Sequence, residues 1–555
     1  MNIDELEKVI EKGETLTCEF KSDRKPLPDK DLISAVVALA NTEGGELYLG
    51  VEDDGTVSGL HPNHKAVQGL STLIANKTNP PISVRVEIIE YKTKSIACIH
   101  VPKSRQLVST SDGVLQRRRL LADGRPEAVP FYPHEFTQRL SGLGLTDVSS
   151  KPIETLPTEV FRPLERERLR EAIRKYGGDT SLLNLADNEF DGALGFVSEL
   201  NGEYRPTLAG ILFLGSEDLI RREVPSYEIA FQVLSGTDVL VNEFFHSPLV
   251  HAFEEVERLF NARVIEKEIQ VGLFRVPVPN YERRAFREAF INALIHRDFS
   301  ALGAVHVRID DSGMTISNPG GFVEGVNLDN LLVVEPRPRN PLLADITKRI
   351  GLAERTGRGI DKIFEGLLRY GRPSPDYSRS DAHSVIVRMS NVESDMSFLE
   401  MVIKEEDRRN GKLPLESLII LSRLRNERRL STKDIAPSLQ RSEHDTRSAI
   451  EVLVEAGLVE AHGTGRGRTY TLSARVYTQS GKKSGYIRQA GFDPIQQEQM
   501  VLQYIDTHGS IKRAEAADLC RIGTFQASRL LKRLADENKI LLKGKKRGAY
   551  YVRNT

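Results

Sequence analysis

Hydrophobic and polar positions alternate near the start of the chain. In the segment LTCEFK, the apolar side chains are expected to face a core, because successive side chains of a strand point to opposite faces; they are Leu16, Cys18 and Phe20. Glu19 and Lys21 then share the other face of this strand. The alternation therefore predicts a half-buried strand with an acid and a base side by side.

The pattern predicts an α+β domain over residues 1–140. After a short first helix and the strand, a second helix ends in the sequence NTEGG, which is typical of a turn into a strand, and another turn follows at Glu52-Asp53-Asp54-Gly55. Three arginines stand before a loop rich in Gly and Pro: Arg117, Arg118 and Arg119. The helix and the three strands that follow it are expected at residues 31–40, 46–51, 84–91 and 95–101.

A segment rich in Gly, Ser, Thr and Pro separates this domain from the next one. Residues 160–279 then show helical and strand patterns in turn, which predicts a mixed α/β connecting domain. No catalytic constellation is evident in this domain. The expected elements lie at residues 165–176, 207–213, 227–234 and 249–260.

Residues 281–364 contain the parts of a nucleotide pocket in three pieces. In the first piece, Glu288 precedes Asn292 by four residues on an amphipathic helix, so the two side chains share one face. A carboxylate beside a carboxamide suits a bound Mg²⁺ ion and an attacking water, since hard cations take oxygen ligands. The first piece thus predicts a metal ligand and a general base.

The other two pieces are rich in glycine. Two strands lead into the sequence NPGG, which contains Asn318, Gly320 and Gly321. Gly357 and Gly359 stand just before a helix whose first amide groups can receive phosphate oxygens.

These three pieces, in this order, resemble the GHKL ATPases, the group of gyrase, the large heat-shock chaperones, MutL and histidine kinases. The resemblance implies an α/β sandwich over residues 280–392 that binds ATP and Mg²⁺. Glu288 would be the general base and Asn292 the magnesium ligand, and residues 322–354 would form the ATP lid. Slow ATP hydrolysis and a degenerate pocket both remain open.

One position departs from the GHKL pattern. Asn318 stands where the family has an Asp that accepts a hydrogen bond from the adenine amino group, although a carboxamide oxygen can still accept. The letters His296-Arg297-Asp298 copy a kinase catalytic loop. A kinase glycine loop and Asp-Phe-Gly sequence do not accompany them, so the kinase interpretation is rejected.

The first domain resembles the Schlafen family and its bacterial Alba-like relatives through CEFK, the sequence ISAVVALANTEGGELYLGVEDDG and VSGL. In nucleolytic Schlafens three acids bind a divalent metal and cut RNA, and the resemblance places them at Glu14, Glu19 and Asp53, with Lys21 beside the second. Mg²⁺ or Mn²⁺ would activate water there. Arg117, Arg118 and Arg119 would deliver the phosphate backbone. Relatives with the same letters act as DNA-binding regulators, so nuclease activity and regulatory binding stay open.

The last part of the chain predicts two copies of three helices and a hairpin, over residues 412–475 and 494–555, and each copy resembles a winged helix. Such modules bind duplex DNA with the third helix and the wing, or serve as packing modules. The first copy is rich in Glu and fits packing better. The second is expected to contact nucleic acid through Arg529, Lys532, Lys543, Lys545, Lys546 and Arg547.

Composition agrees with a chain of several domains. The 555 residues are 39% hydrophobic and 28% charged, and the net charge is -1. From residue 479 onward, fifteen Lys or Arg face seven Asp or Glu, which is about +8 and indicates nucleic-acid binding. The three cysteines are expected to be buried thiols in a reducing compartment. With no membrane-length apolar run and a polar start, we expect a cytoplasmic protein.

The sequence as a whole predicts an α/β multidomain protein: a Schlafen-like domain, a GHKL-type domain and tandem winged helices. We expect an ATP-gated nucleic-acid-binding protein with a metal-dependent nuclease domain, acting in stress or phage defence as a homodimer or higher assembly. The alternative is a nucleotide-sensing, DNA-binding transcriptional regulator without nuclease activity. A Walker A loop is absent from the sequence, so a helicase is not expected.

Overall fold

The structure is a computed structural model. It describes residues 3–104, 106–121, 124–142, 146–271, 274–354, 357–427, 429–463, 465–473, 476, 494–520, 522–544 and 549–554. The chain divides into two compact units. Unit 1 consists of Met1–Val148 with Val323–Gly325, and unit 2 of Ser149–Phe322 with Val326–Thr555.

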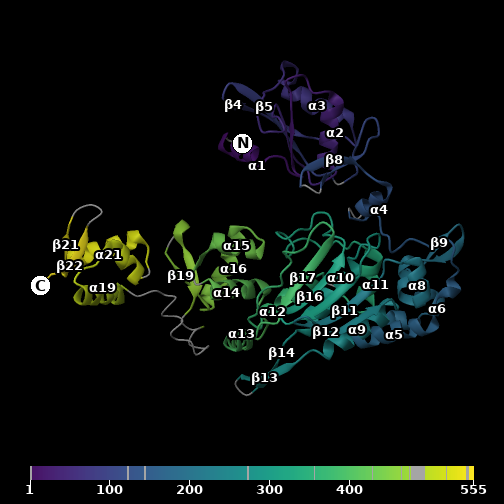
Figure 1. Ribbon diagram of the computed structural model, residues 1–555. Helices are drawn as coiled ribbons and strands as arrows, with labels where there is room; N and C mark the ends of the chain where they lie inside the picture. Colours follow the sequence, from purple (N-terminus) through teal and green to yellow (C-terminus); the bar gives the residue numbers. More distant parts are fainter. Residues whose placement is uncertain are drawn as a thin grey trace. The chain divides into compact units, whose positions relative to one another are not determined.

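Unit 1 is built around a four-stranded sheet in the order β1-β2-β5-β4, with β1 parallel to β2 and the other pairs antiparallel (Figure 1). The predicted strands and helix are all observed. The elements are α1 (Ile3–Lys12), β1 (Cys18–Lys21), α2 (Asp29–Ala40), β2 (Gly45–Leu49), α3 (Val67–Lys77), β3 (Thr78–Asn79), β4 (Arg85–Tyr91), β5 (Lys94–Val101), β6 (Ser109–Thr110), β7 (Gln116–Leu120), β8 (Pro126–Pro130) and α4 (Pro133–Gly142).

The glycine pair between α2 and β2 is required by close backbone contacts. A Cβ atom on Gly45, whose φ is +137°, would lie 2.1 Å from the carbonyl oxygen of Thr17. A Cβ atom on Gly44 would lie 2.6 Å from the backbone nitrogen of Lys103. The turn therefore holds β2 against the start of β1, which explains the Gly-Gly in the predicted motif.

Both faces of this sheet are covered by hydrophobic clusters. Leu47 and Leu49 of β2 belong to the cluster around α2, whereas Cys18, Phe20 and Tyr48 belong to the cluster that includes Leu6 of α1. The expectation that Glu19 emerges on an open face is therefore wrong, and Glu19 is 8% exposed. The prediction of buried free thiols is confirmed for all three cysteines.

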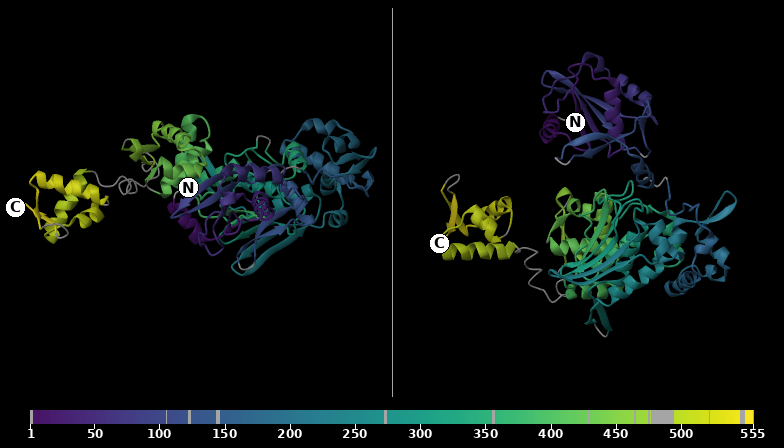
Figure 2. Two further views of the ribbon diagram at one scale, coloured as in Figure 1. Left: turned by 90° about the horizontal axis from the view of Figure 1, so that it is seen from above. Right: turned by 45° about the vertical axis from the view of Figure 1, so that its right-hand side comes forward.

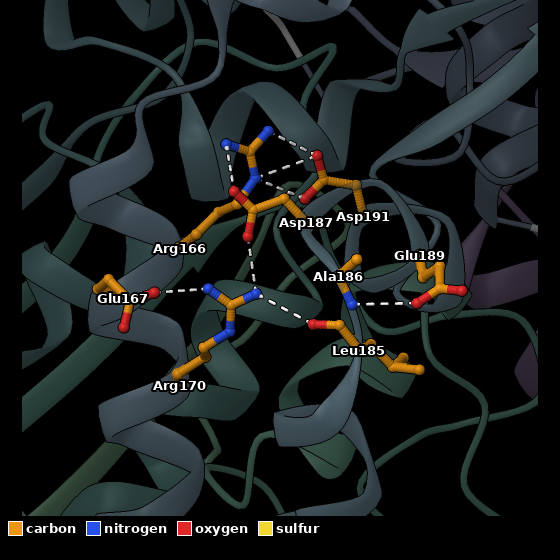
Figure 3. A network of polar contacts seen from close by, with 8 residues as sticks. All are labelled: Arg166, Glu167, Arg170, Leu185, Ala186, Asp187, Glu189 and Asp191. Atoms are coloured by element: carbon orange, nitrogen blue, oxygen red, sulfur yellow. Dashed lines mark hydrogen bonds and ion pairs between the residues drawn. The ribbon is translucent and has the colours of Figure 1, made fainter.

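Unit 2 begins with helices and a small hairpin that precede the central sheet. Its first elements are α5 (Pro163–Tyr176), α6 (Asp187–Ala193), β9 (Val197–Leu200), β10 (Glu203–Pro206), α7 (Leu208–Leu214) and α8 (Glu217–Glu223). Figure 3 shows how α5 is tied to α6: Arg166 forms a paired contact with the buried Asp191 at 2.7–3.1 Å, and Arg170 bonds Asp187 at 2.7 Å. Planar guanidinium groups suit this forked geometry.

The central sheet of unit 2 has five strands in the order β12-β11-β15-β16-β17 (Figures 1 and 2). The strand β11 is parallel to β15, and the other pairs are antiparallel. The helix α10 packs on β15 and β16, and α12 packs on α10. The elements are β11 (Ile229–Ser235), β12 (Asp238–Phe245), α9 (Leu249–Asn261), β13 (Glu266–Val271), β14 (Phe274–Pro279), α10 (Arg283–Ile295), β15 (Val305–Asp310), β16 (Gly313–Pro319), α11 (Pro341–Arg349), α12 (Gly359–Leu368) and β17 (Ser384–Ser390).

The predicted boundary at residue 279 runs through this sheet. The strands β11 and β12 come from the segment expected to be a separate connecting domain, yet they pair with the strands of the nucleotide segment. One hydrophobic cluster extends from Leu156 to Val476 and includes residues on both sides of that boundary. The connecting segment and the nucleotide segment therefore share one core.

Two further groups of helices follow the sheet, each ending in a hairpin as the sequence predicts. Module 1 consists of α14 (Leu415–Asn426), β18 (Leu430–Ser431), α15 (Thr432–Leu439), α16 (Glu443–Glu455), β19 (Val459–His462) and β20 (Thr469–Leu472). Module 2 consists of α19 (Pro494–His508), α20 (Arg513–Cys520), α21 (Thr524–Asp536), β21 (Ile540–Lys543) and β22 (Tyr550–Arg553). In the described parts of the chain, helices with the length and apolar character of a membrane span are absent.

The helix α13 (Met396–Arg409) is rich in charged residues but packs into the core. Its buried side chains include Phe398, Met401 and Val402, which belong to the large cluster of unit 2. Most of its charged residues are exposed or half-buried and conceal the apolar stripe in the sequence, whereas Glu405 is buried and pairs with Arg408 and Arg409. Module 1 shares the same cluster through Leu418 and Ile420, so it packs on the nucleotide segment.

Candidate nucleotide site and N-terminal acidic residues

Two of the three predicted pieces of the nucleotide pocket meet at α10 and α12. Glu288 and Asn292 lie one turn apart on α10, and α12 begins at Gly359. A Cβ atom on Gly359 would lie 2.7 Å from Oε2 of Glu288 and 3.6 Å from Nδ2 of Asn292. Because a side chain at position 359 would displace the carboxylate, glycine permits the amide end of α12 to approach both groups.

The carboxyl group of Glu288 is buried, with 6% of the residue exposed. Burial raises its pKa above the ordinary glutamate value, and Lys362 and Arg287 partly offset this effect. Lys362 lies on α12, one turn after Gly359, and also forms an ion pair with Glu354. The site thus combines a carboxyl group of raised proton affinity with a lysine on the helix expected to receive phosphate.

The NPGG segment begins at the end of β16. Asn318 is buried, and its Nδ2 donates to the carbonyl oxygen of Pro319 at 3.2 Å, an orientation compatible with the acceptor role predicted for its side-chain oxygen. Gly320 has a φ of +95°, and a Cβ atom there would lie 2.7 Å from Cβ of Asp298. A Cβ atom on Gly321 would lie 2.6 Å from the carbonyl oxygen of Asp381. Both glycines therefore allow tight packing of this turn.

A buried polar cluster that the sequence did not reveal joins the end of α10 to this turn. Arg339 donates to the carbonyl oxygens of His296 at 3.2 Å and Gly321 at 2.9 Å, and lies 3.7 Å from the Asp298 carboxylate. Asn340 donates to the carbonyl oxygens of Ile295 and Arg297 at 2.9 and 2.8 Å. These side chains hold the backbone around the pocket.

The His-Arg-Asp sequence at residues 296–298 has a structural role at the end of α10. Arg297 is 1% exposed and donates to the carbonyl oxygens of Asp298, at 2.7 Å, Ser226 and Gly303. The Asp298 carboxylate accepts from the backbone and hydroxyl groups of Ser300 at 2.9 and 2.6 Å. These three residues directly follow the helix that contains Glu288. That position is the sequence signal from which their structural role beside the candidate site could have been predicted.

The predicted lid contacts module 1. Gly357 has a φ of +74°, and a Cβ atom there would lie 2.6 Å from Cγ of Pro336, so the second glycine segment lies against the lid. Gln440, between α15 and α16, forms two hydrogen bonds to the lid backbone. Its Oε1 accepts from the backbone nitrogen of Leu332, and its Nε2 donates to the carbonyl oxygen of Leu328, both at 2.6 Å.

The three N-terminal acids occupy different surroundings. Glu14 accepts a hydrogen bond from the backbone nitrogen of Phe20 at 2.7 Å, and Asp53 is exposed in the turn after β2. Glu19 forms ion pairs with Arg118 and with Lys21, the latter at 2.5 Å. Among the described residues, the group of three possible ligands whose atoms lie within 4.8 Å of one another is a different one, Glu46, Cys98 and His100.

Of the three arginines of β7 expected to deliver the phosphate backbone, Arg118 is the one whose burial contradicts that role. Arg118 is 3% exposed and donates to the carbonyl oxygens of Thr15 and Cys18 in addition to its pair with Glu19. A phosphate contact by Arg118 does not fit this burial, because its guanidinium group is committed to the interior. Arg117 pairs with Glu135, and Arg119 is exposed, 3.6 Å from Glu127.

In module 2, the cations described by the structure lie at the surface. Arg529 and Lys532 are exposed on α21, and Lys543 is exposed at the end of β21. The guanidinium group of Arg529 lies 4.7 Å from the ring centre of Phe525, which is 69% exposed. Lys545, Lys546 and Arg547 lie outside the described residues.

Three family models match parts of the chain. The Schlafen AlbA_2 model matches residues 14–120, the model described as "Putative ATP-dependent DNA helicase recG C-terminal" matches residues 303–389, and a domain of unknown function, DUF8451, matches residues 145–230. None of the curated proteins compared with the chain matches it. The crystal structure of the DIP2311 protein from Corynebacterium diphtheriae is similar over 99% of both chains, with 19% identity and a TM-score of 0.51, which indicates a shared fold.

The chain is thus a multidomain protein that joins a Schlafen AlbA_2 domain to an ATPase-type domain. More particularly, its ATPase-type domain matches the recG C-terminal model and contains β15, β16 and the NPGG turn. The predicted order of these two domains is confirmed.

Proposed function

We propose that the chain is an ATP-binding, nucleic-acid-binding protein whose nucleotide state controls its nucleic-acid-binding parts. The observation that supports this most directly is the approach of Gly359 to Glu288 and Asn292. The first amides of α12 would receive phosphate oxygens, and Asn292 would hold the Mg²⁺ that accompanies ATP. When bound, Mg²⁺ would neutralise phosphate charge.

Glu288 would hold a proton at its carboxylate during slow ATP turnover. Its burial raises its pKa, which makes the carboxylate a better proton acceptor than an exposed glutamate. Lys362 on α12 would keep a positive charge near this carboxylate. A GHKL-type sandwich is consistent with the sheet and with α10 and α12 packed on one side.

Gln440 provides a physical connection between the lid of the nucleotide site and module 1. It connects the lid to the turn that precedes α16, which is the third helix of module 1. In a winged helix the third helix is the one that enters the major groove. A lid that moves with nucleotide would therefore shift the turn before α16, while module 1 keeps its apolar side chains in the core that it shares with the nucleotide segment.

Gln440→Ala is expected to reduce the effect of ATP on duplex affinity while leaving ATP binding close to that of the wild type. Couplings between sites are typically 5- to 150-fold, and the ratio of duplex affinities with and without ATP should fall toward one. Fluorescence anisotropy with labelled duplex measures this ratio. Gln232→Ala, which removes a glutamine bond to Asn242 between neighbouring strands, is the control. An unchanged ratio in Gln440→Ala would rule out this route.

The N-terminal domain is proposed to be a metal-dependent nuclease that uses Glu14, Glu19 and Asp53, with Lys21 beside them. Mg²⁺ or Mn²⁺ would be held by these carboxylates and would supply an activated water. Glu19 would have to exchange its contact with Lys21 or Arg118 for the metal. In this proposal the protein is cytoplasmic, forms a homodimer or higher assembly, and acts in stress or phage defence.

Glu19→Gln is expected to abolish cleavage of tRNA, single-stranded DNA or duplex DNA in the presence of Mn²⁺, with and without ATP, while nucleic-acid binding remains. Asp54→Asn, in the same turn as Asp53, is the matched control and should keep cleavage. The melting temperature must accompany the assay, because removing one partner of a buried ion pair costs about 3–5 kcal/mol. Cleavage by Glu19→Gln at the wild-type rate would contradict the assignment.

The second candidate is a nucleotide-sensing transcriptional regulator without nuclease activity. The observation that favours it is the pairing of Glu19 with Arg118 and Lys21, which already neutralises the carboxylate. If wild-type protein cuts none of the three substrates under any metal or nucleotide condition, this function replaces the nuclease. The DNA contacts expected in module 2 are the same in both candidates.

A further inference from the structure

A thiol, an imidazole and two carboxylates gather on one face of the sheet of unit 1. They are Glu46 on β2, Glu87 on β4, and Cys98 and His100 on β5. Glu46 is the cross-strand partner of His100, and Glu87 is the partner of Cys98, so the pleat places all four side chains on the same face. We name these four residues the thiol–imidazole cluster.

The cluster lies on the opposite face from Glu19. Along β1 and β2, Cys18 pairs with Glu46, whereas Glu19 pairs with Leu47. Because successive residues of a strand point to opposite faces, Glu46 and Glu19 are on different sides of the sheet. The cluster is therefore separate from Glu19, the central acid proposed for the nuclease site.

The distances within the cluster suit a tetrahedral ion. Nε2 of His100 lies 3.7 Å from Sγ of Cys98 and 3.8 Å from Oε2 of Glu87. Zinc ligands lie about 2.0–2.3 Å from the ion, so two ligands at a tetrahedral angle are roughly 3.3–3.8 Å apart. An ion held by the thiol and the imidazole would need the Glu87 carboxylate to turn toward Cys98, because the three residues whose ligand atoms all lie within 4.8 Å of one another are Glu46, Cys98 and His100.

The fourth member orients the imidazole. Oε1 of Glu46 lies 3.3 Å from Nδ1 of His100, and the hydroxyl group of Tyr48 donates to Oε2 of the same carboxylate. A carboxylate that accepts from one ring nitrogen fixes the tautomer in which the other nitrogen can bind metal. Nδ1 faces a carboxylate, and Nε2 faces the thiol and the second carboxylate.

We propose that the thiol–imidazole cluster binds a zinc-type divalent cation through Cys98, His100 and Glu87, with Glu46 as the positioning residue. A thiolate and an imidazole select borderline-soft ions such as Zn²⁺ over Mg²⁺, which prefers oxygen ligands. The divalent charge offsets the thiolate and the two carboxylates, which lie close together in a partly buried place. The ion would join β4 and β5 directly, and β2 through the contact of Glu46 with His100, and would stabilise the domain.

Without an ion, the same groups contact one another directly. This metal-free arrangement competes with metal binding. Burial raises the pKa of Cys98 to about 12, with Glu46 and Glu87 adding to the effect, so the thiol is protonated in that state. Binding of the cation requires the Cys98 thiol to lose its proton to solvent. A direct sulfur–metal bond is therefore the property that distinguishes the two states.

The test uses the full chain, freed of metal with a chelator and then titrated with Co²⁺ as a spectroscopic substitute for Zn²⁺. One equivalent of Co²⁺ should produce a thiolate-to-metal charge-transfer band in the near ultraviolet, and Zn²⁺ should displace it. Cys98→Ser should lose the band. Glu46→Gln should keep the band but bind about 10–100-fold more weakly, as changes to an orienting partner do.

Cys18→Ser is the matched control, because Cys18 is also a buried thiol on the same sheet face. This variant should keep the band and the affinity of the wild type. Circular dichroism shows which variants are folded, and His100→Gln replaces Cys98→Ser if the latter is not. The proposal is overturned if the wild type shows no band, or if Cys18→Ser loses it while Cys98→Ser keeps it.

Discussion

Gly359→Ala is expected to lower the affinity for Mg-ATP by about 10- to 100-fold with little change in melting temperature. The added Cβ atom would lie 2.7 Å from the Glu288 carboxylate and would displace either that side chain or the start of α12. The loss corresponds to one or more hydrogen bonds to a charged group, which contribute about 1.5–3 kcal/mol each. Isothermal titration calorimetry with ATP and Mg²⁺ measures the affinity.

Two variants separate this effect from general damage. Gly192→Ala, where an added Cβ atom meets nothing within 4 Å, should bind ATP as the wild type does. Glu288→Gln should retain binding and lose turnover, since the base and not the phosphate contacts is removed. Wild-type affinity in Gly359→Ala would exclude α12 from the nucleotide site.

Replacing three of the exposed cations of module 2, Arg529, Lys532 and Lys543, by alanine is expected to weaken binding to every duplex sequence. Arg529, Lys532 and Lys543 would each neutralise one phosphate. The slope of log affinity against log salt should flatten by about 2.7 units for three lost contacts. Anisotropy titrations at several salt concentrations measure both quantities.

The matched control removes three surface cations that are paired along their own helices: Arg221, Arg258 and Lys404. Their replacement should leave affinity and slope close to the wild-type values. If the module 2 variant also keeps both, module 2 is a packing module. A loss confined to one DNA sequence would indicate base contacts instead of phosphate contacts.

Local features of the fold were predictable because they rest on nearby residues. The Gly44-Gly45 turn and the capping box of Ser431 and Asp434 at the start of α15 are encoded within a few positions. The helix phase that pairs Glu288 with Asn292 is equally local. Each of these local patterns has the predicted conformation in the structure.

The features that were missed depend on contacts between distant residues. The pairing of Arg118 with Glu19 joins positions 99 residues apart, and three adjacent arginines resemble a phosphate-binding surface when read alone. Arg339 and Asn340 stand in a Pro-rich stretch that predicts a loop, although both are buried against the end of α10. The membership of β11 in the central sheet also required long-range pairing.

The hydrophobic cluster that runs from Leu156 to Val476 sets how this protein can be divided or recombined. Since the sheet, α13 and module 1 bury their apolar side chains against one another, a cut between any of them would expose surface on both fragments. Heat should melt these parts together, in one transition. During evolution, the nucleotide segment and module 1 would therefore be inherited as one piece, and a transplant of the nucleotide site into another chain would have to carry residues 149–476 with it.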